Sequence, residues 1–537
     1  MSRTLRACWF LGCAVLTMLE QARLVSFLIG RYTNEDHAIL WLAASDWMRL
    51  RPREPTFYGQ SYGENLEAIP IGVMHMFGLS YGTAFPVAML ALALAAWWLL
   101  AFGAHKHGSA FAALLAAAAP LLLNVDHWVI VGVIGTGVGR MLAAAAAALI
   151  LGASPNARTL GWSVAVGSFA IALDSASAML VVPAFAWACL AWIRVRRFWI
   201  PLGLGALPAI AWKGYCLWFQ TAHPDHALHS AWTATTSWET FLKNLDDPGP
   251  LLSAHALQLH PRGELIVGLT VAFLIISVVA RSARAVLSAT SLLGLLAALV
   301  AMDKSLDNSA SLWFSASRMT LIVPMSVWFV GFVSVDALRS RRLSRAPRRW
   351  VTGFGYVGLA AIMLATKVDR VHGWKERLRA IEDVGLRKEN MPLSKVEEVE
   401  ERCREANAAA LAAQTRIVIY PHNRALAYAC PALYRNLLTA HPSYERRAWV
   451  LRALSEKVVD RMILWSVEPR VCKGRAFRRG LASCVPIARD RGVLATFAKQ
   501  PALDVVRRLG FGVRPFGTGC DPVTREGCDW WAARYKN

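Results

Sequence analysis

The sequence has few acidic residues and lacks several motifs that mark soluble enzymes. It contains 36 Asp and Glu against 58 Lys and Arg, a formal net charge of +22 over 537 residues. No CxxC pair occurs, which argues against a zinc site built from cysteine pairs. Residues 367–537 contain no phosphate-loop glycine motif, no HExxH and no GxSxG, so nothing there indicates a nucleotide-binding, metalloprotease or serine-hydrolase domain.

Apolar residues, in contrast, are abundant and come in long runs. They make up 55% of the chain, and the runs approach the roughly 20 residues that a helix needs to cross a bilayer. They stop near residue 366, so we expect a transmembrane part, 1–366, followed by a water-facing domain, 367–537. About eleven transmembrane helices are predicted, at 8–29, 84–103, 109–124, 129–151, 160–176, 177–193, 199–216, 264–280, 285–301, 319–338 and 350–366.

The positions of the basic residues predict an orientation. With eleven spans, the Arg- and Lys-rich connections all fall on one side, which is therefore cytoplasmic. The N-terminal helix follows a basic segment and has no small-residue cleavage site before Arg31, so we interpret it as retained. These inferences predict a membrane protein with a cytoplasmic N-terminus and a C-terminal domain on the outer side of the membrane. The basic residues concerned are Arg3, Arg6, Lys106, Arg158, Arg194, Arg196, Arg197, Arg281, Arg284, Arg339, Arg341, Arg342, Arg345, Arg348 and Arg349.

Charge clustered in loops between apolar runs favours membrane topology over nucleic-acid binding. The alternate connections are larger or less basic, and they carry most of the unusual polar residues. A second basic group lies in the C-terminal domain, where it could face anionic lipid headgroups or an anionic substrate. The predicted external connections are 30–83, 125–128, the hairpin near Asp174, 217–263 and 302–318.

Cysteine use differs between the two predicted parts. Four cysteines lie in or beside apolar spans, where a free thiol behaves as a small apolar group. Six lie in the C-terminal domain, at 403, 430, 472, 484, 520 and 528. An even number in an external domain predicts disulfides, with zinc as the alternative. The close pairs Cys472–Cys484 and Cys520–Cys528 are the first candidates among fifteen pairings.

The C-terminal domain alternates helix and strand patterns. A polar helix with mixed charges precedes a strand at 416–420, and helical stretches near 444–460 precede a second strand at 462–465. This order predicts a small α/β domain. Its role would be to bind an acceptor or to brace the external loops.

The first external loop, 30–83, carries the clearest candidate for chemistry. Glu35 and Asp36 come directly after the first span, where a carboxylate at the interface could act as a general base or bind a metal. An amphipathic stretch follows and predicts an interfacial helix. A second short apolar helix comes at the end of the loop. The alternative interpretation is that the acidic pair caps a helix and faces water.

Beyond the acidic pair, the loop contains Tyr58-Gly59-Gln60-Ser61-Tyr62 and then Leu66-Glu67-Ala68. Together with the predicted topology, these elements resemble the GT-C superfamily of integral-membrane glycosyltransferases, particularly protein O-mannosyltransferase-like enzymes and their bacterial relatives. Members have an acidic pair after the first helix, and many bacterial ones continue with a YGQ…LEA element. The resemblance covers about residues 1–366.

The resemblance implies an inverting glycosyltransferase that moves a sugar from a polyprenyl-phosphate donor to an acceptor on the outer face. Asp36 or Glu35 would be the base, with Asp36 preferred. The donor phosphate would bind Arg318, which opens the tenth span, or Arg140 in the fourth. The segment that begins at Arg318 resembles an element of the family but departs from it at the next position, where Met319 replaces an aromatic residue.

Further positions in the loop follow from the same resemblance. Tyr58, Gln60, Tyr62 and Glu67 would contact the sugar or the acceptor. The resemblance implies no certain cofactor, and a divalent metal is possible. Partners would be the lipid-linked donor and membrane lipids, and not nucleic acid; the oligomeric state is not indicated.

Two other function classes compete with the enzyme. A transporter or flippase for lipid-linked glycans usually shows internal repeats and mid-membrane charges, and no repeat is evident here. A non-catalytic assembly or sensor protein would not need the acidic pair. The sugar, the acceptor (lipid, polysaccharide or protein) and the choice between Glu35 and Asp36 are not determined by the sequence.

Overall fold

A computed structural model gives the fold of the chain as two compact units. The helical unit comprises residues 1–29, 86–214 and 233–390, and the sheet unit comprises residues 30–85, 215–232 and 391–537. The sheet unit thus combines the first external loop with the C-terminal residues. The structure describes residues 4, 7–8, 11–12, 14–19, 22, 31–58, 65–123, 127, 131, 137–223, 236–245, 264–302, 321–342, 394–420, 424–441, 448–465, 472, 482–487 and 491–508.

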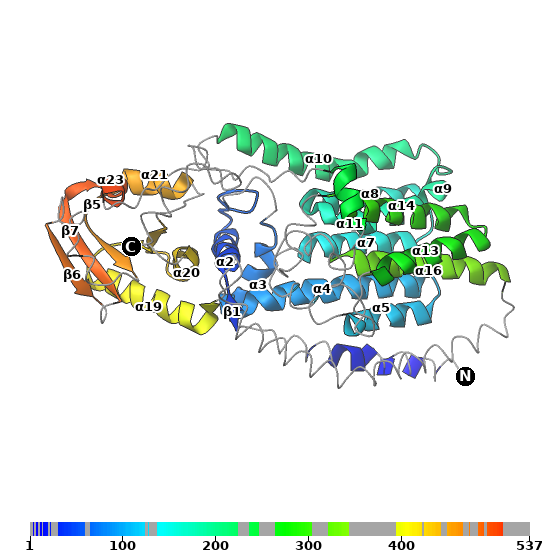
Figure 1. Ribbon diagram of the computed structural model, residues 1–537, viewed down its shortest axis with the longest axis horizontal. Helices are drawn as coiled ribbons and strands as arrows, with labels where there is room; N and C mark the ends of the chain where they lie inside the picture. Colours follow the sequence, from blue (N-terminus) through cyan, green and yellow to red (C-terminus); the bar gives the residue numbers. More distant parts are fainter. Residues whose placement is uncertain are drawn as a thin grey trace. The chain divides into compact units, whose positions relative to one another are not determined.

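The helical unit is built from apolar helices, as the runs of apolar residues predict (Figure 1). Each predicted span between residues 84 and 338 has a helix at the same place in the chain. The predicted span 350–366 lies outside the described residues. The helices are α4 (Tyr81–Lys106), α5 (Ala110–Leu122), α7 (Gly137–Gly152), α8 (Ala157–Leu173), α9 (Ala178–Trp192), α10 (Trp199–Ala222), α11 (Trp238–Leu245), α13 (Glu264–Val279), α14 (Ala283–Val300) and α16 (Val323–Arg342).

Four of the described helical segments are long and apolar enough to cross a membrane: 81–106, 175–192, 199–222 and 283–300. Four more apolar helices, α5, α7, α8 and α13, are shorter. The chain is therefore a mostly helical, multi-pass membrane protein, and the count of eleven spans stays a prediction.

Small residues allow these helices to pack closely. Alanines of α4, α5, α7 and α9 are almost completely buried in one apolar core. At the crossing of α8 and α10, a Cβ added to Gly205 would lie 2.6 Å from the carbonyl oxygen of Gly161. Close backbone approach through small residues is how helices associate where apolar burial gives no preference between protein and lipid.

Polar contacts tie together one end of the helical unit. His107, just after α4, lies 3.0 Å from the carbonyl oxygen of Leu151 and 3.3 Å from the carboxylate of Asp336. Arg284 donates from Nε to the carbonyl oxygen of Trp187 at 2.9 Å and lies over its ring. These residues adjoin connections that the topology places on a single side. The contacts therefore agree with the predicted alternation of the helices, although they do not show which side is cytoplasmic.

The sheet unit contains a mixed five-stranded sheet in the order β4-β3-β5-β7-β6. β3 is parallel to β4 and β5, whereas β7 is antiparallel to β5 and β6. Its elements are β1 (Tyr32–Thr33), α2 (Glu35–Trp47), α3 (Ala68–Met76), β2 (Ser394–Lys395), α19 (Val396–Ala412), β3 (Ile417–Ile419), α20 (Arg424–Leu433), β4 (Leu438–Ala440), α21 (Ala448–Glu456), β5 (Val458–Trp465), β6 (Ser483–Ile487), β7 (Gly492–Pro501) and α23 (Ala502–Arg508).

The two faces of this sheet have different partners. Ile417 and Ile419 share a core with Val450 of α21 and Val505 of α23. Residue 418 between them points to the opposite face, because side chains alternate along a strand. α19 packs on β3, and α20 packs on β4 and α19. The predicted helix–strand boundary was wrong here: β5 begins at Val458 rather than 462, because its β-branched residues pair with the end of β7.

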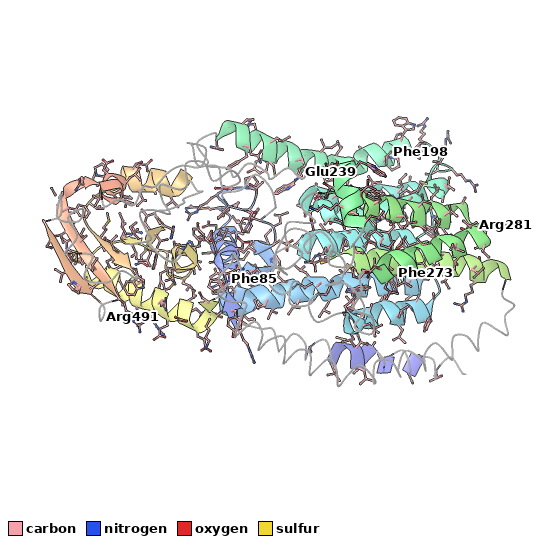
Figure 2. The ribbon with its side chains drawn as sticks, in the orientation of Figure 1. Phe85, Phe198, Glu239, Phe273, Arg281 and Arg491 are labelled. Atoms are coloured by element: carbon pink, nitrogen blue, oxygen red, sulfur yellow. A yellow bond between two sulfur atoms is a disulfide. The ribbon has the colours of Figure 1, made fainter. Side chains whose placement is uncertain are left out.

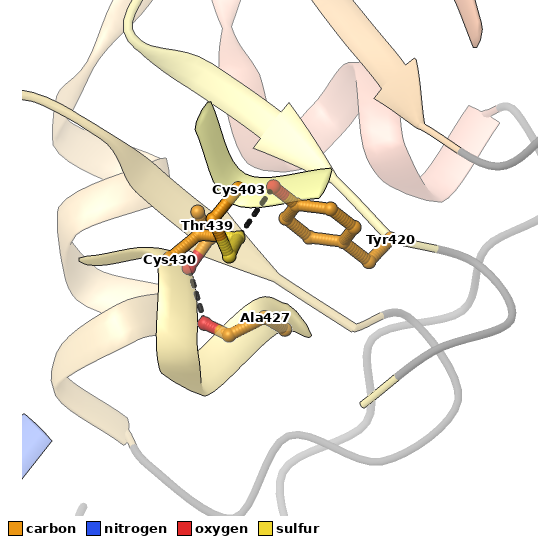
Figure 3. Close-up of a disulfide and its surroundings, with 5 residues drawn as sticks. All are labelled: Cys403, Tyr420, Ala427, Cys430 and Thr439. Atoms are coloured by element: carbon orange, nitrogen blue, oxygen red, sulfur yellow. Dashed lines mark hydrogen bonds between the residues drawn. A yellow bond between two sulfur atoms is a disulfide. The ribbon is translucent and has the colours of Figure 1, made fainter. Parts of the chain in front are cut away.

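Two disulfides lie in the sheet unit. Cys403 of α19 is bonded to Cys430 of α20, and Cys472 is bonded to Cys484 of β6. The first bond is fully buried. Around it, Tyr420 donates from its hydroxyl to Cys430 Sγ at 3.1 Å, and Thr439 donates to the carbonyl oxygen of Ala427 (Figure 3). Cys520 and Cys528 lie outside the described residues.

Candidate functional site

The acidic pair begins a helix with a formed N-cap. Asn34 has an extended backbone conformation, and its side-chain oxygen accepts a hydrogen bond from the His37 amide at 2.9 Å. Glu35 and Asp36 form the first turn of α2, and both are half-buried. The first turn of a helix stabilises negative charge, because its free amide groups and the helix dipole both point toward it. The local sequence Asn-Glu-Asp therefore fixes where the two carboxylates lie.

Beneath the acidic pair, α2 is buried over most of its length. The ring of His37 stacks on that of Phe85, a residue labelled in Figure 2, with 4.1 Å between the two centroids. Trp41 stacks on Tyr81 at 6.3 Å. An interfacial helix with one apolar face was expected; instead both faces are covered within the unit. The first turn is thus held rigidly by packing as well as by its cap.

The strand before the acidic pair is anchored on the C-terminal residues. Tyr32 and Thr33 pair with Lys395 and Ser394 in an antiparallel two-stranded sheet. The Val396 amide then donates to the carbonyl oxygen of Arg31 at 3.1 Å. A Cβ added to Gly82, at the start of α4, would lie 2.1 Å from a methyl carbon of Val396. The C-terminal residues therefore brace the loop that carries Glu35 and Asp36.

A buried polar cluster fixes the other end of α2. The Tyr58 hydroxyl donates to Asp46 at 3.0 Å and accepts from the Arg53 amide at 3.2 Å. The Arg53 guanidinium forms an ion pair with Asp46 at 2.9 Å. Burial raises the pKa of Asp46, against the opposing effects of Arg53 and Tyr58. Burial likewise raises the pKa of Tyr58. This cluster occupies the Tyr58 hydroxyl, which was predicted to contact a sugar.

Of the other three residues predicted to contact the sugar or the acceptor, the structure describes Glu67. Glu67 is buried and precedes α3, but its side chain does not cap that helix. Gln60 and Tyr62 lie outside the described residues. Trp47 donates from Nε1 to the Asn65 side chain at 3.0 Å, so the loop returns to α2 just before Glu67.

Of the two predicted phosphate-binding arginines, Arg140 lies among the described residues. Arg318 lies outside the described residues. Arg140 lies in the first turn of α7 and is 2% exposed. Its charge interacts with that of Asp174, and Asp174 also packs against Gly139. Asp174 accepts from the Ala176 amide at 3.0 Å and so caps η1 (Ser175–Ser177). Arg140 is therefore a buried cation beside a capping carboxylate.

Two features of this unit were not recognised in the sequence. Residues 78–82 match G-x-S-x-G, but Ser80 follows the helix α3 rather than a strand and caps α4 by accepting from the Thr83 amide at 3.3 Å. That context is not the strand–turn–helix of a hydrolase nucleophile. The Asp46 cluster was also missed, because its partners are brought together only by folding of the loop. Among the described residues, no group of three His, Cys, Asp or Glu side chains could hold a metal ion.

Comparison with solved structures identifies the fold. The crystal structure of ArnT from Cupriavidus metallidurans bound to undecaprenyl phosphate matches with a TM-score of 0.50 and 13% identity, over 92% of this chain and 98% of that one. The apo form of the same protein matches with a TM-score of 0.45 and 15% identity, over 90% and 97%. No protein-family model and no curated protein matches. The expected fold is thus confirmed by the likeness to ArnT, and at 13% identity that likeness concerns the fold alone.

Proposed function

We propose that this chain is an inverting glycosyltransferase of a bacterial inner membrane, which moves a sugar from a polyprenyl-phosphate donor to a periplasmic acceptor. The observation that carries the proposal is the capped first turn of α2, where Glu35 and Asp36 are held half-buried at the end of a packed helix. The likeness in fold to ArnT, whose structure contains undecaprenyl phosphate, supports the same class of donor.

The reaction requires a base, and a carboxylate supplies it. The base takes the proton of the acceptor hydroxyl while the hydroxyl oxygen forms a bond to the anomeric carbon. The bond from that carbon to the phosphate oxygen breaks on the opposite face, and polyprenyl phosphate departs with the electron pair. One displacement inverts the configuration, and no covalent intermediate with the protein is formed.

The two carboxylates cannot share this role equally. Successive residues in a helix point about 100° apart, so Glu35 and Asp36 face different directions from one turn. We assign proton removal to Asp36 and orientation of the acceptor to Glu35. The stacking of His37 on Phe85 keeps this turn from rotating.

The departing phosphate needs a cation to stabilise its charge. The proposal assigns this role to Arg318 or Arg140. Arg140 is the one of the two that the structure describes, and the neighbouring Asp174 reduces its net positive field. Arg318 carries the role if substitution of Arg140 by Gln, which removes the charge, leaves transfer unchanged.

The test is transfer from radiolabelled polyprenyl-phosphate sugars by the full-length protein in detergent. We expect Asp36→Asn to lower the rate by about 10²–10⁴-fold, the usual contribution of a general base, and Glu35→Gln to lower it less. Asp504→Asn is the matched control, because Asp504 is an exposed acid in the first turn of α23. Absence of transfer with every donor, or full activity in both acidic-pair variants, would refute the proposal.

A further inference from the structure

A basic cavity lies within the sheet unit, at the ends of its strands. Its volume is about 580 Å³, within the range of roughly 300–1,000 Å³ typical of small-molecule sites. Residues from β3, β4, β5 and β7 line it, together with Leu42 of α2. Six cationic side chains contribute to the wall: Arg53, Arg416, Arg435, Lys457, Arg461 and Lys499.

The negative charge near this cavity balances only part of the positive charge. Asp460 is its one acidic lining residue and forms an ion pair with Arg461 at 3.0 Å. Arg53 pairs with Asp46. Within the described part of the chain, no carboxylate forms an ion pair with Arg435, Lys457 or Lys499. An excess of like charge opposes folding unless an anion or solvent compensates it.

One of these cations, Arg435, interacts with a further positive charge, that of Arg49. Burial lowers the pKa of Arg49, and the charge of Arg435 adds to this effect. Arg416 donates from Nε to the carbonyl oxygen of Asn436, which holds the guanidinium beside the cavity without neutralising it. The repulsion is therefore between Arg49, in the turn after α2, and Arg435, in the segment before β4.

The backbone around the cavity is irregular in a way that positions side chains. The pairing of β5 with β7 shifts register between Val459 and Arg461, where Asp460 lies opposite the extra residues 497–499 of β7. Bulges redirect side chains and are frequent beside sites. Thr415 donates from its hydroxyl to the carbonyl oxygen of Arg461 at 3.1 Å, which closes the wall between β3 and β5.

The side-chain amide of Gln414 lines the cavity, although the backbone of this residue has an unfavourable conformation. It follows α19 with φ +50°, a left-handed conformation in which glycine is favoured. The Thr415 amide bonds back to Ala410 and the Gln414 amide to Leu411, which defines the end of the helix. A glutamine is thus retained where glycine would be less strained, and its side chain lines the cavity.

We propose that the basic cavity binds the anionic group, a phosphate or carboxylate, of the saccharide that accepts the transferred sugar. The cations supply charge-assisted hydrogen bonds to its oxygens, and the Gln414 amide supplies hydrogen bonds to sugar hydroxyls. Asn436 donates from Nδ2 to Asn407 Oδ1 at 2.8 Å, so it contributes its side-chain oxygen as an acceptor. The role of this saccharide as the acceptor rests on the proposed function. The binding of an anionic saccharide in the cavity does not depend on it.

The experiment measures binding calorimetrically to the full-length protein in phosphatidylcholine nanodiscs. N-acetylglucosamine 1-phosphate is the probe, with inorganic phosphate and uncharged N-acetylglucosamine in parallel. We expect the sugar phosphate to bind more tightly than either and to weaken as salt is raised, since screening shortens the reach of charge. Nanodiscs containing phosphatidylglycerol distinguish a lipid source of the anion: loss of sugar-phosphate binding there would mean that the cations face headgroups and would overturn the proposal.

Variants locate the binding. The triple variant Arg435→Gln, Lys457→Gln and Lys499→Gln is expected to bind the probe with an affinity lower by about tenfold or more. Arg404→Gln is the matched control, because Arg404 is exposed on α19 and does not line the cavity. Gln414→Gly should weaken binding while leaving the protein equally or more stable, a combination that a merely structural role does not produce. Equal binding by the triple variant and the control overturns the site.

Transfer assays separate this inference from the proposed function. If the sugar phosphate binds at the cavity but no donor supports transfer, the enzyme proposal fails and the anion site stands. If transfer occurs but the triple variant uses anionic and neutral acceptors as the parent does, the acceptor role fails and the enzyme stands. The expected result is a selective rise in KM for anionic acceptors, with kcat preserved.

Discussion

The contacts that stabilise the helical unit differ in kind from those that stabilise the sheet unit. In the helical unit, alanines and glycines let apolar helices meet closely, and the polar contacts lie mainly at the helix ends. In the sheet unit, two disulfides, a mixed sheet and the buried Asp46 cluster fix segments that lie far apart in the sequence. The contrast reflects the solvent: covalent and polar bonds specify a small water-facing domain, whereas close packing specifies helices in lipid.

The cavities of the two units differ in the same way. The helical unit has one of about 380 Å³ with almost entirely apolar walls from α4, α5, α13 and α16. The basic cavity of the sheet unit is about 580 Å³ and is lined by cations and amides. An apolar wall offers dispersion contacts without fixing orientation, whereas charges and amides orient a polar ligand. The lining of the basic cavity is therefore better suited than that of the apolar cavity to orient a polar ligand.

Among the contacts that distinguish the two units, the buried disulfide should make the largest contribution to the free energy of unfolding. Cys403 and Cys430 close a loop with a sequence separation of 27, for which the loss of chain entropy predicts about 3–4 kcal/mol of stabilisation. Cys403→Ala with Cys430→Ala should lower the free energy of unfolding by that amount. Chemical denaturation in detergent, followed by tryptophan fluorescence, measures it.

A free cysteine in the helical unit provides the control. Cys189 is half-buried in α9, and its thiol donates to the carbonyl oxygen of Ala186, within the same helix. Cys189→Ala should therefore change stability by less than about 1 kcal/mol. Equal losses from the double variant and from Cys189→Ala would remove the distinction between the units.

A smaller effect is expected from helix packing in the helical unit. A methyl group at Gly205 would meet the Gly161 carbonyl at 2.6 Å, whereas nothing lies within 4 Å of a Cβ at Gly203. Gly205→Ala should cost about 1–3 kcal/mol through overpacking. Gly203→Ala, in the same helix, should be neutral or gain up to about 1 kcal/mol from helix propensity. Thermal unfolding of both variants decides it, and a gain at both positions would contradict close packing.

The helices and the acidic turn were predictable because their signals are local. A run of apolar residues specifies a helix wherever it occurs, and Asn34 followed by two acids is a helix start in itself. The apolar pattern predicted a helix at each span between residues 84 and 338, but it did not predict the short helix α11 within the connection 217–263. The acidic pair was expected to precede an interfacial helix, whereas it forms the first turn of that helix, α2.

What escaped prediction depends on contacts distant in sequence. The pairing of Thr33 with Ser394 joins the first loop to the C-terminal residues, and no local pattern encodes it. Cys403–Cys430 was one of fifteen pairings and was not among the first candidates. The basic cavity collects side chains from four strand ends, so it exists only once the strand order β4-β3-β5-β7 is formed.

A single hydroxyl in the sheet unit should have a measurable but lesser effect. Tyr58→Phe removes the donor to Asp46 and the acceptor for the Arg53 amide, both within a buried cluster. Leaving such groups unsatisfied costs about 1–3 kcal/mol. Tyr434→Phe is the control, because Tyr434 is less buried and its hydroxyl has no assigned partner among the described residues. If Tyr58→Phe keeps full stability and raises KM for the sugar donor instead, Tyr58 contacts the ligand and does not brace the loop.

The smallest expected effect concerns the pH dependence of the same cluster. Burial raises the pKa of Asp46, while Arg53 and Tyr58 oppose the shift. The folded state then holds the proton more tightly than the unfolded state, so the contribution to stability is present at low pH and is lost as pH rises through the folded-state pKa. Asp46→Asn keeps an oxygen acceptor for Tyr58 and removes the titration. Between about pH 4 and pH 7 the variant should lose less stability than the parent, by about 1 kcal/mol or less, because the Arg53 ion pair is partly exposed. Unfolding midpoints across that range measure the difference, with exposed Asp504→Asn as the control. A variant curve that runs parallel to the parent's would show that Asp46 does not titrate with folding.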